Sequence, residues 1–340
     1  MTILVTGGSG FVGIHTVAEL RRRGYAVNVL VRDPARAARA LRSVGVDASA
    51  LRLITGDVTD PTAVRRALRN CEAVLHAAAV YSFDPRRSAE MRTINRRGTE
   101  VVLAAGRAAG VRRLVHVSTF GALLPAAAPL STATPVGRPR ETYLATKAEA
   151  ETVARRYQDE GDPVVITYPP AVLGPHDPHL GDQSSRIRDV LRGLMPIWPG
   201  GGFPIGDVRD LAVLHATLLT DGGGPGRHFG PGRWVPTREL LRTLRQVTGR
   251  RLPTLHLPAA ALLPVGRLAG LVQRVLPVHI PVQYGAVYTC AVARPLDAAG
   301  TGEPLGGPGR PLRTTLADTV RWLHATGHLT ARQAGRAAAP

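Results

Sequence analysis

The amino-acid sequence predicts an α/β fold in which helices cover both faces of a doubly wound parallel sheet. Six short apolar runs, rich in β-branched residues, alternate with helical patterns through the first half of the chain, and this alternation is typical of a parallel sheet. The first run passes through three glycines straight into a helical pattern. The predicted strands are residues 2–5, 27–31, 51–54, 73–75, 114–117 and 164–167.

The turn after the first strand carries glycines in the spacing G-x-x-G-x-x-G, with an apolar helical pattern beginning between the second and the third. Glycines let the backbone approach a phosphate closely, and the free N–H groups at a helix N-terminus attract its negative charge. An ordinary tight turn can have the same residues, but the position after the first strand favours a pyrophosphate site. That site would consist of Gly7, Gly10, Phe11, Val12 and Gly13.

Arg32 ends the second strand, 19 residues after Gly13, and Asp33 follows it. In a dinucleotide-binding unit this position meets the adenosine ribose, where an arginine accommodates the 2′-phosphate of NADP and an acid binds the 2′-hydroxyl of NAD. The order of the two residues predicts NADP, with NAD as the alternative. A solvated pair of charges at a strand end is the structural alternative.

Short polar or small residues follow the next two strands. Asp57, with Val58 beside it, is placed to accept a hydrogen bond from an adenine amino group. Ala77 and Ala78 follow the fourth strand, and their small side chains would let the backbone pass close to a cofactor. We expect His76, just before them, to have a structural partner instead of a catalytic role.

Tyr143 and Lys147 are four residues apart in a helical pattern, so they share one helix face. An ammonium beside a phenol lowers the phenol pKa from its usual value of about 10, which makes tyrosine a usable general acid or base. Lys147 is the only lysine in a chain with 43 Lys and Arg residues. Thr119 follows the fifth strand at the sheet edge where ligands bind, and its hydroxyl is predicted to hold a substrate oxygen.

The composition of the chain argues against several other classes of protein. The net charge is +18, but the arginines are scattered, so we expect no nucleic-acid partner. Cys71 and Cys290 form no metal or disulfide pattern, which predicts no metal site and a reducing cytoplasm. No apolar stretch reaches 18 residues and a strand begins at once, so we expect neither membrane insertion nor a signal peptide.

The chain is expected to divide into a dinucleotide-binding domain and a substrate-binding lobe. The domain would comprise residues 1–174, with 206–230 returning to it, and the lobe would comprise 175–205 and 231–328. Within the lobe, residues 257–276 predict an apolar lid or core helix, with contact to a membrane surface as the alternative. Residues 329–340 are polar and rich in Ala and Arg, which predicts a disordered tail.

These motifs, taken in order over about residues 1–325, resemble those of the extended short-chain dehydrogenase/reductases, also called the NAD-dependent epimerase/dehydratase family. The matching positions are Thr6-Gly7-x-x-Gly10-x-x-Gly13, Asp57, His76-Ala77-Ala78, Asn95-x-x-Gly98-Thr99, Ser118-Thr119 and Tyr143-x-x-x-Lys147. The resemblance implies a Rossmann-type domain and a smaller C-terminal lobe. It also implies Thr119, Tyr143 and Lys147 as catalytic residues, with Lys147 also binding the nicotinamide ribose. Because most members carry serine at the position of Thr119, Ser118 is the alternative.

Three local features indicate a branch within that family. Phe120-Gly121 follow Thr119 where sugar-nucleotide dehydratases carry Asp-Glu. The sequence Pro169-Pro170-Ala171-Val172 replaces the asparagine usual in sugar-nucleotide epimerases, and Pro170 and Val172 are expected to contact the cofactor. Val31 to Pro34 resembles the NADP-binding end of the branch that contains dihydroflavonol reductase and 3β-hydroxysteroid dehydrogenase. Tyr168 departs from the arginine that the family often has there.

The resulting prediction is an NADP(H)-dependent reductase for a ketone or aldehyde of an apolar small molecule, such as a steroid, terpenoid, flavonoid or polyketide. The substrate would contact the helix at 257–276 and a set of mostly aromatic residues, namely Val80, Phe83, Phe120, Tyr168 and Trp198. The alternatives are an NAD-dependent sugar-nucleotide epimerase and a non-catalytic NADP-sensing regulator. A homodimer is compatible with the sequence.

Overall fold

The computed structural model describes residues 1–82, 85–220, 224–275, 284–297 and 309–338. Its centre is a seven-stranded sheet with the order β10-β6-β5-β4-β1-β2-β3, in which every neighbouring pair is parallel. The strands are β1 (Thr2–Thr6), β2 (Ala26–Val31), β3 (Arg52–Thr55), β4 (Ala73–His76), β5 (Arg113–Val117), β6 (Val164–Tyr168) and β10 (Gly226–Phe229). The predicted doubly wound α/β fold is confirmed, and six of these strands match the predicted ranges closely.

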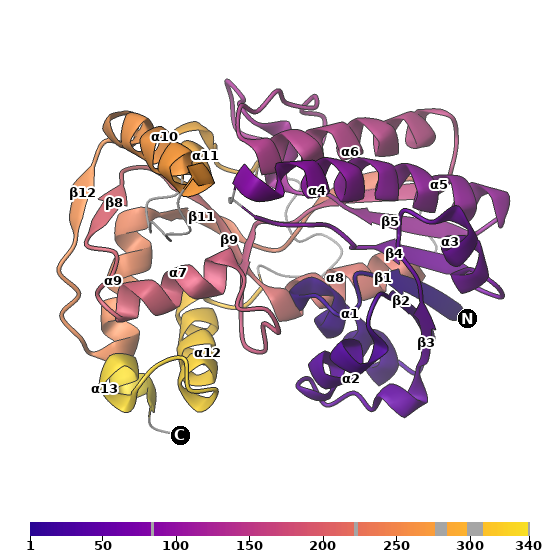
Figure 1. Ribbon diagram of the computed structural model, residues 1–340, viewed down its shortest axis with the longest axis horizontal. Helices are drawn as coiled ribbons and strands as arrows, with labels where there is room; N and C mark the ends of the chain where they lie inside the picture. The colour runs from indigo at the N-terminus through magenta and orange to yellow at the C-terminus, as the bar shows by residue number, and fades with distance from the viewer. Residues whose placement is uncertain (83–84, 221–223, 276–283, 298–308, 339–340) are drawn as a thin grey trace.

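Helices cover both faces of the sheet (Figure 1). One face packs against α1 (Phe11–Arg22), α2 (Pro34–Arg42) and α8 (Val208–Thr220). The other packs against α3 (Pro61–Ala67), α5 (Gly98–Ala108) and α6 (Thr142–Asp159). The central strands are buried along their whole length, which explains why they appear in the sequence as continuous apolar runs.

Local signals determine where several helices begin. Asp33 and Asp60 each accept a hydrogen bond from a backbone N–H of the following first turn, and each precedes a proline at the first helical position. A capping carboxylate satisfies an N–H group that the helix itself leaves unpaired, and proline loses nothing there. Asp33 is therefore engaged as a helix cap, a role that bears on the choice between NAD and NADP.

A second group of elements forms the smaller lobe at the left of Figure 1. It has a three-stranded sheet with the order β11-β9-β7 and a parallel pair, β12 and β8. Its strands are β7 (Ala171–Leu173), β8 (Ile197–Pro199), β9 (Gly202–Asp207), β11 (Arg233–Pro236) and β12 (Leu255–Leu257). Its helices are α7 (Asp182–Leu191), α9 (Thr237–Thr248), α10 (Ala259–Val275), α11 (Tyr284–Val292), α12 (Leu312–Ala325) and α13 (Ala331–Ala334). The chain returns to the main domain between β9 and β11, where α8 packs on the sheet and β10 pairs with β6.

Short elements complete the part of the chain that the structure describes. They are α4 (Ser88–Arg92), the π-helical turn at Thr93–Arg97 and four short 3-10 turns. Those turns are Ala48–Ala50, Pro85–Arg87, Phe120–Leu123 and Gly335–Ala338.

The C-terminal residues differ from the disordered tail that the sequence predicted. Thr330 and Gln333 form a capping box at the start of α13. Leu329, Ala334 and Ala337 are buried in the core that includes α9 and α12. The prediction was wrong because these apolar residues pack into the core, although the segment is polar in overall composition.

Candidate active site

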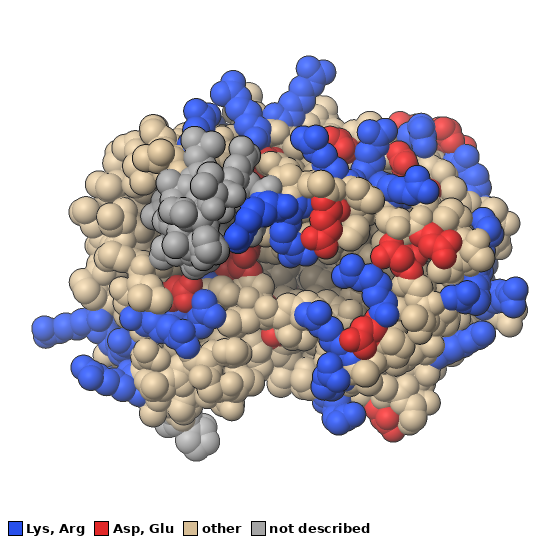
Figure 2. Space-filling view, viewed as in Figure 1, with Lys and Arg blue, Asp and Glu red and all other residues tan. Residues whose placement is uncertain are grey.

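A cavity of about 750 Å³ lies along the carboxyl ends of the parallel strands, between the sheet and the smaller lobe. Its walls come from the glycine-rich turn, the segments that follow β2 to β6, and helices α6, α7 and α11. Figure 2 shows the hollow between the two lobes, with several blue basic side chains at its rim. Carboxyl strand ends are where open α/β sheets bind their ligands, so this cavity is the candidate active site.

The glycine-rich turn closes tightly under one end of the cavity. Gly7 has a φ of 73°, and a Cβ atom there would lie 2.6 Å from the carbonyl carbon of Ala77. A Cβ on Gly13 would overlap the carbonyl oxygen of Gly7. Side chains at these positions would therefore force apart the turn, the first helix and the segment after β4. The predicted pyrophosphate and backbone-approach residues all line the cavity, namely Gly7, Gly10, Phe11, Val12, Gly13, Ala77 and Ala78. Together they form a glycine-rich cradle that fits a dinucleotide pyrophosphate.

Two exposed arginines line the same end of the cavity, Arg32 after β2 and Arg36 in the first turn of α2. Asp33 is not among the lining residues, and its carboxylate accepts from the backbone N–H of Arg36 at 2.9 Å. The end of β2 therefore presents positive charge to the cavity. This arrangement fits a phosphate better than a ribose hydroxyl.

Asp57 and Val58 line this end as well. The carboxylate of Asp57 accepts from the N–H and the hydroxyl of Thr59, at 2.8 and 2.6 Å. Burial acts to raise the pKa of Asp57, but these hydrogen bonds and the charge of Arg32 outweigh it, and the pKa is lowered. Asp57 therefore stays ionised and available as a hydrogen-bond acceptor.

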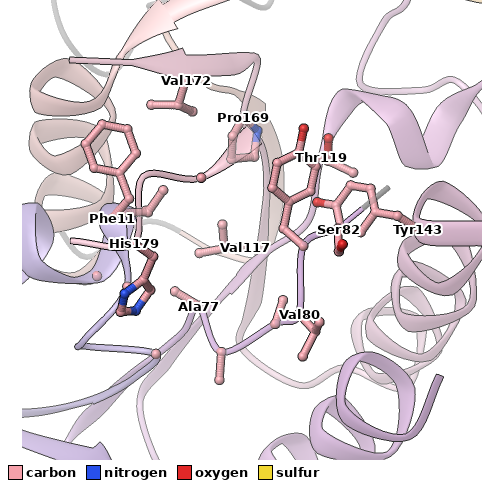
Figure 3. A pocket seen from close by; sticks show the side chains of 18 of the residues that line it. Phe11, Ala77, Val80, Ser82, Val117, Thr119, Tyr143, Pro169, Val172 and His179 are labelled. Atoms are coloured by element: carbon pink, nitrogen blue, oxygen red, sulfur yellow. The ribbon is translucent and has the colours of Figure 1, made fainter. Parts of the chain in front are cut away.

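The opposite end of the cavity is lined by two residues of helix α6, Tyr143 and Lys147. Figure 3 shows Tyr143 and Thr119 together on one side, with Phe11 and His179 on the other. Lys147 is buried, and its ammonium donates to the carbonyl oxygen of Val117 at 2.8 Å. Burial lowers the pKa of Lys147 to about 8, against the opposing effect of the Glu151 charge.

The pKa of Tyr143 differs from the expectation. Burial of its hydroxyl raises the pKa above 10, and the negative charges of Glu141 and Asp182 raise it further. Lys147 is not among the causes of that shift, because its ammonium is directed to the backbone of β5. The phenol is consequently protonated at neutral pH, the state that a proton donor requires.

The hydroxyl-bearing residues Ser118 and Thr119, which follow β5, also line the cavity. The hydroxyl oxygen of Thr119 accepts from the N–H of Gly121 at 3.2 Å. The hydroxyl of Ser118 is buried and has no hydrogen-bond partner within the described ranges. Both remain candidates for contact with a substrate oxygen. His76, by comparison, has the expected structural partners, since its ring nitrogens lie 2.8 and 3.1 Å from the hydroxyls of Thr6 and Thr99.

The expected substrate-binding residues divide between the cavity and the core. Val80 and Phe120 line the cavity, and so do Pro170 and Val172, which were expected to contact the cofactor. Tyr168 and Trp198 do not line it and are buried in the core. Tyr168 lies on the face of the sheet that α6 covers, where its hydroxyl contacts Glu151. Those two assignments were wrong, and Phe83 lies outside the described residues.

Helix α10, which corresponds to the predicted helix at 257–276, contributes none of the described lining residues. Instead, Ala286 and Thr289 of α11 line the cavity. Val265 and Leu268 of α10 are exposed, at 50% and 63%. An apolar helical pattern alone does not distinguish a helix that lines a site from one at the surface.

Several lining residues had no recognisable sequence signal. The ring of Tyr81 packs edge-on against Tyr143, with centroids 4.6 Å apart. Gln183 of α7 donates to the Tyr81 hydroxyl at 3.2 Å and accepts from Arg186 at 3.0 Å. Asp182 lines the cavity from the same helix. This polar wall lies in the part of the chain with the loosest pattern, which is why sequence analysis missed it.

The model of the family described as "NAD dependent epimerase/dehydratase family" matches residues 3–230. The chain belongs to the NAD-dependent epimerase/dehydratase family. This member of the family is accordingly an NAD(P)-dependent oxidoreductase.

Two curated relatives span nearly the whole length of this family member. "Sterol demethylase protein B" of Methylococcus capsulatus is 28% identical, over 96% of this chain and 99% of the relative. A Stigmatella aurantiaca enzyme is 30% identical, over 94% of this chain and 96% of the relative, and its name is "4-hydroxy-2-methyl-3-oxo-4-farnesyl-3,4-dihydroquinoline-1-oxide ketoreductase".

Solved structures have a similar fold. The crystal structure of gox2253 has a TM-score of 0.80 and 26% identity, with 97% of this chain and 99% of that chain covered. The UDP-glucose 4-epimerase of Bifidobacterium longum, in complex with NAD+ and UDP, has a TM-score of 0.74 at 20% identity, with 96% and 99% covered. At 20% identity, the similarity to the epimerase shows a shared fold and nothing more. No helix in the described ranges is long and apolar enough to cross a membrane.

Proposed function

We propose that this protein is an NADP(H)-dependent reductase of a ketone or aldehyde in an apolar small molecule. The observation that carries the proposal is the arrangement of one continuous cavity. Tyr143, Lys147 and the hydroxyls after β5 line one part of it, and Arg32 lines the part beyond the glycine-rich cradle. A dinucleotide lying along the strand ends would have its nicotinamide beside Tyr143 and its 2′-phosphate beside Arg32.

The proposed chemistry needs a hydride and a proton. When bound, the reduced nicotinamide supplies the hydride to the carbonyl carbon. Thr119, or Ser118 beside it, donates a hydrogen bond to the carbonyl oxygen and orients it. Tyr143 then donates its proton to that oxygen, since its raised pKa keeps the phenol protonated. Lys147, one helical turn from Tyr143 and also lining the cavity, would donate to the nicotinamide ribose and so orient the ring.

The apolar character of the substrate rests on the cavity wall and on two relatives. Val80, Phe120 and Ala286 line the cavity. The printed names of the relatives refer to a sterol and to a farnesyl quinoline oxide. Gln183 and Arg186 add hydrogen-bonding groups on one side, which suits a largely apolar molecule that carries a few polar substituents.

A sugar-nucleotide epimerase is the enzymatic alternative, favoured by the solved epimerase of similar fold. A sugar nucleotide needs cations near its diphosphate, and Arg186 is a lining cation that could serve. Calorimetry of the NADPH complex separates the two functions. The proposal expects binding of apolar ketones, whereas micromolar binding of a UDP- or dTDP-sugar without a response to ketones would favour the epimerase.

The catalytic assignment is tested with Tyr143→Phe. The aromatic ring still packs against Tyr81, but the proton donor is lost, and general acid catalysis typically contributes 10²–10⁴-fold in rate. We expect ketone reduction to fall by about that factor while NADPH binding stays within a few-fold of wild type. Turnover within threefold of wild type would refute the assignment. A non-catalytic NADP-sensing regulator, the remaining alternative, would show no reduction in the wild-type protein.

A further inference from the structure

The loop between β7 and α7 reaches across the cavity to helix α2. The guanidinium of Arg36 donates to Nδ1 of His179 at 3.1 Å, although the two residues are 143 positions apart. Both side chains line the cavity. Figure 3 shows His179 on the same side of the cavity as Phe11, which opens the helix after the glycine-rich turn. The two residues therefore form a bridge over the cofactor end of the cavity.

The loop is held in place by contacts within both lobes. Asp177 is buried, and its carboxylate accepts from the N–H of His179 at 3.2 Å, the N–H of Gly181 at 2.9 Å and the hydroxyl of Ser184 at 2.8 Å. At the other end, Nε2 of His15 lies 3.0 Å from the carbonyl oxygen of Pro175. Because His15 belongs to α1, the loop is fixed against the helix whose N-terminus faces the cradle.

The loop backbone also departs from ordinary conformations. His176 and Leu180 have φ angles of 63° and 44°, in a region that side chains other than glycine adopt at a cost. Such residues persist only where the surrounding contacts enforce them, and they concentrate at functional sites. Leu180 itself lines the cavity. The strain, together with the Asp177 contacts, indicates a loop that is shaped in advance to present His179.

The chemistry of the pair suits an anion. Arg36 has no carboxylate within ion-pair distance among the described residues. Since Nδ1 of His179 accepts from Arg36, the ring proton is on Nε2, and that N–H is a hydrogen-bond donor. A guanidinium and an imidazole N–H that converge on one cavity provide donors for phosphate oxygens.

We propose that Arg36 and His179 together bind a phosphate of the dinucleotide, so that the loop clasps the cofactor at the end of the cavity where the glycine-rich turn lies. This inference rests on the proposed use of a dinucleotide. Either of two phosphate groups of the dinucleotide could be the one that Arg36 and His179 bind. One is the 2′-phosphate, which would lie near Arg32, and the other is the pyrophosphate, which would lie near Phe11.

Direct binding of NADPH and NADH to the full-length protein tests the proposal, by calorimetry in the absence of a ketone. We expect His179→Ala to weaken NADPH binding by about fivefold, the loss typical of one hydrogen bond. Arg36→Ala should weaken it by at least tenfold, because a charged partner is lost. A loss confined to NADPH identifies the 2′-phosphate, and an equal loss for NADH identifies the pyrophosphate.

Arg39→Ala is the matched control, because Arg39 is exposed one turn further along α2 and does not line the cavity. Equal weakening by Arg36→Ala and Arg39→Ala would indicate only a general effect of charge and would overturn the clasp. Unchanged affinity of a folded His179→Ala variant for both cofactors would also overturn it. If the wild-type protein binds neither cofactor, the proposed function itself fails, and this outcome differs from both of the others.

Discussion

The hydroxyl of Tyr168 donates to Oε1 of Glu151 at 2.6 Å, in a fully buried site one helical turn from Lys147. Arg155 donates to both partners, at 2.8 Å to Oε1 of Glu151 and at 2.9 Å to the Tyr168 hydroxyl. The carboxylate is thus bound by a neutral donor from β6 and a cation from its own helix. The resemblance led us to expect an arginine at the position of Tyr168, and in this structure the cation beside Glu151 is Arg155.

We predict that Tyr168→Phe lowers the free energy of unfolding by about 1–3 kcal/mol, because a buried carboxylate then loses a donor. Urea denaturation measures the change. Tyr157→Phe is the control, since Tyr157 is also buried and no hydrogen bond of its hydroxyl is found among the described residues. Equal destabilisation by the two substitutions would contradict a specific role of the Tyr168 hydroxyl.

The lowered pKa of Lys147 predicts how the rate depends on pH. Burial brings this pKa to about 8, so the ammonium is charged below that pH and loses its charge above it. Because a charged ammonium is a stronger donor to the nicotinamide ribose than a neutral amine, the rate of ketone reduction should fall as the pH rises above about 8. Initial rates from pH 6 to pH 10 at saturating NADPH measure it, and a profile that stays flat to pH 10 would exclude this role.

Lys147→Arg should fail even though it conserves charge. The guanidinium is planar and larger than the ammonium, and the Lys147 site is buried with Nζ directed at the Val117 carbonyl. We expect a loss of at least 10²-fold in kcat, measured beside a check of folding by circular dichroism. A folded variant with nearly wild-type turnover would show that any positive charge at this position suffices.

Arg32 is predicted to make the protein prefer NADPH over NADH. A charged contact with the 2′-phosphate contributes about 1.5–3 kcal/mol, or roughly 10- to 150-fold in the ratio of kcat/KM values. Arg32→Ala should remove most of that preference. Asp33→Ser keeps a capping side chain at the start of α2 and should leave the preference unchanged. If Asp33→Ser changes the ratio of kcat/KM values and Arg32→Ala does not, then Asp33, not Arg32, contacts the ribose.

The raised pKa of Glu141 predicts a pH-dependent contribution to stability. Burial raises this pKa from 4.5 to about 7, although the carboxylate accepts from the N–H groups of Tyr143 and Leu144. The folded state therefore binds the proton more tightly than the unfolded state. The stabilisation is complete below pH 4.5 and is lost as the pH rises through about 7.

Glu141→Gln removes this titration and leaves an amide oxygen as an acceptor. Relative to wild type, the variant should gain about 1–3 kcal/mol of unfolding free energy between pH 4.5 and pH 8. Urea denaturation of both proteins at the two pH values measures the gain. A difference between the proteins that does not change with pH would show that Glu141 titrates normally.

Local patterns in the sequence were enough to predict the sheet, the glycine-rich turn and the Tyr143–Lys147 pair. Each depends on residues that are close along the chain: β-branched runs, glycines at a strand–helix junction, or two side chains four positions apart on a helix. Such patterns depend on the local secondary structure and not on contacts with distant parts of the chain. The family resemblance rested on the same local motifs, and the match to residues 3–230 confirms it.

Tertiary structure alone decided which side chains reach the cavity. Tyr168 and Phe120 are both buried aromatic residues near strand ends, but only Phe120 lines the cavity. Tyr168 is the last residue of β6, and its hydroxyl is directed to Glu151 in the core, whereas Phe120 begins the turn that follows β5. His179 meets Arg36 only because the fold brings together segments 143 residues apart, and no pattern within a short stretch of sequence carries that information.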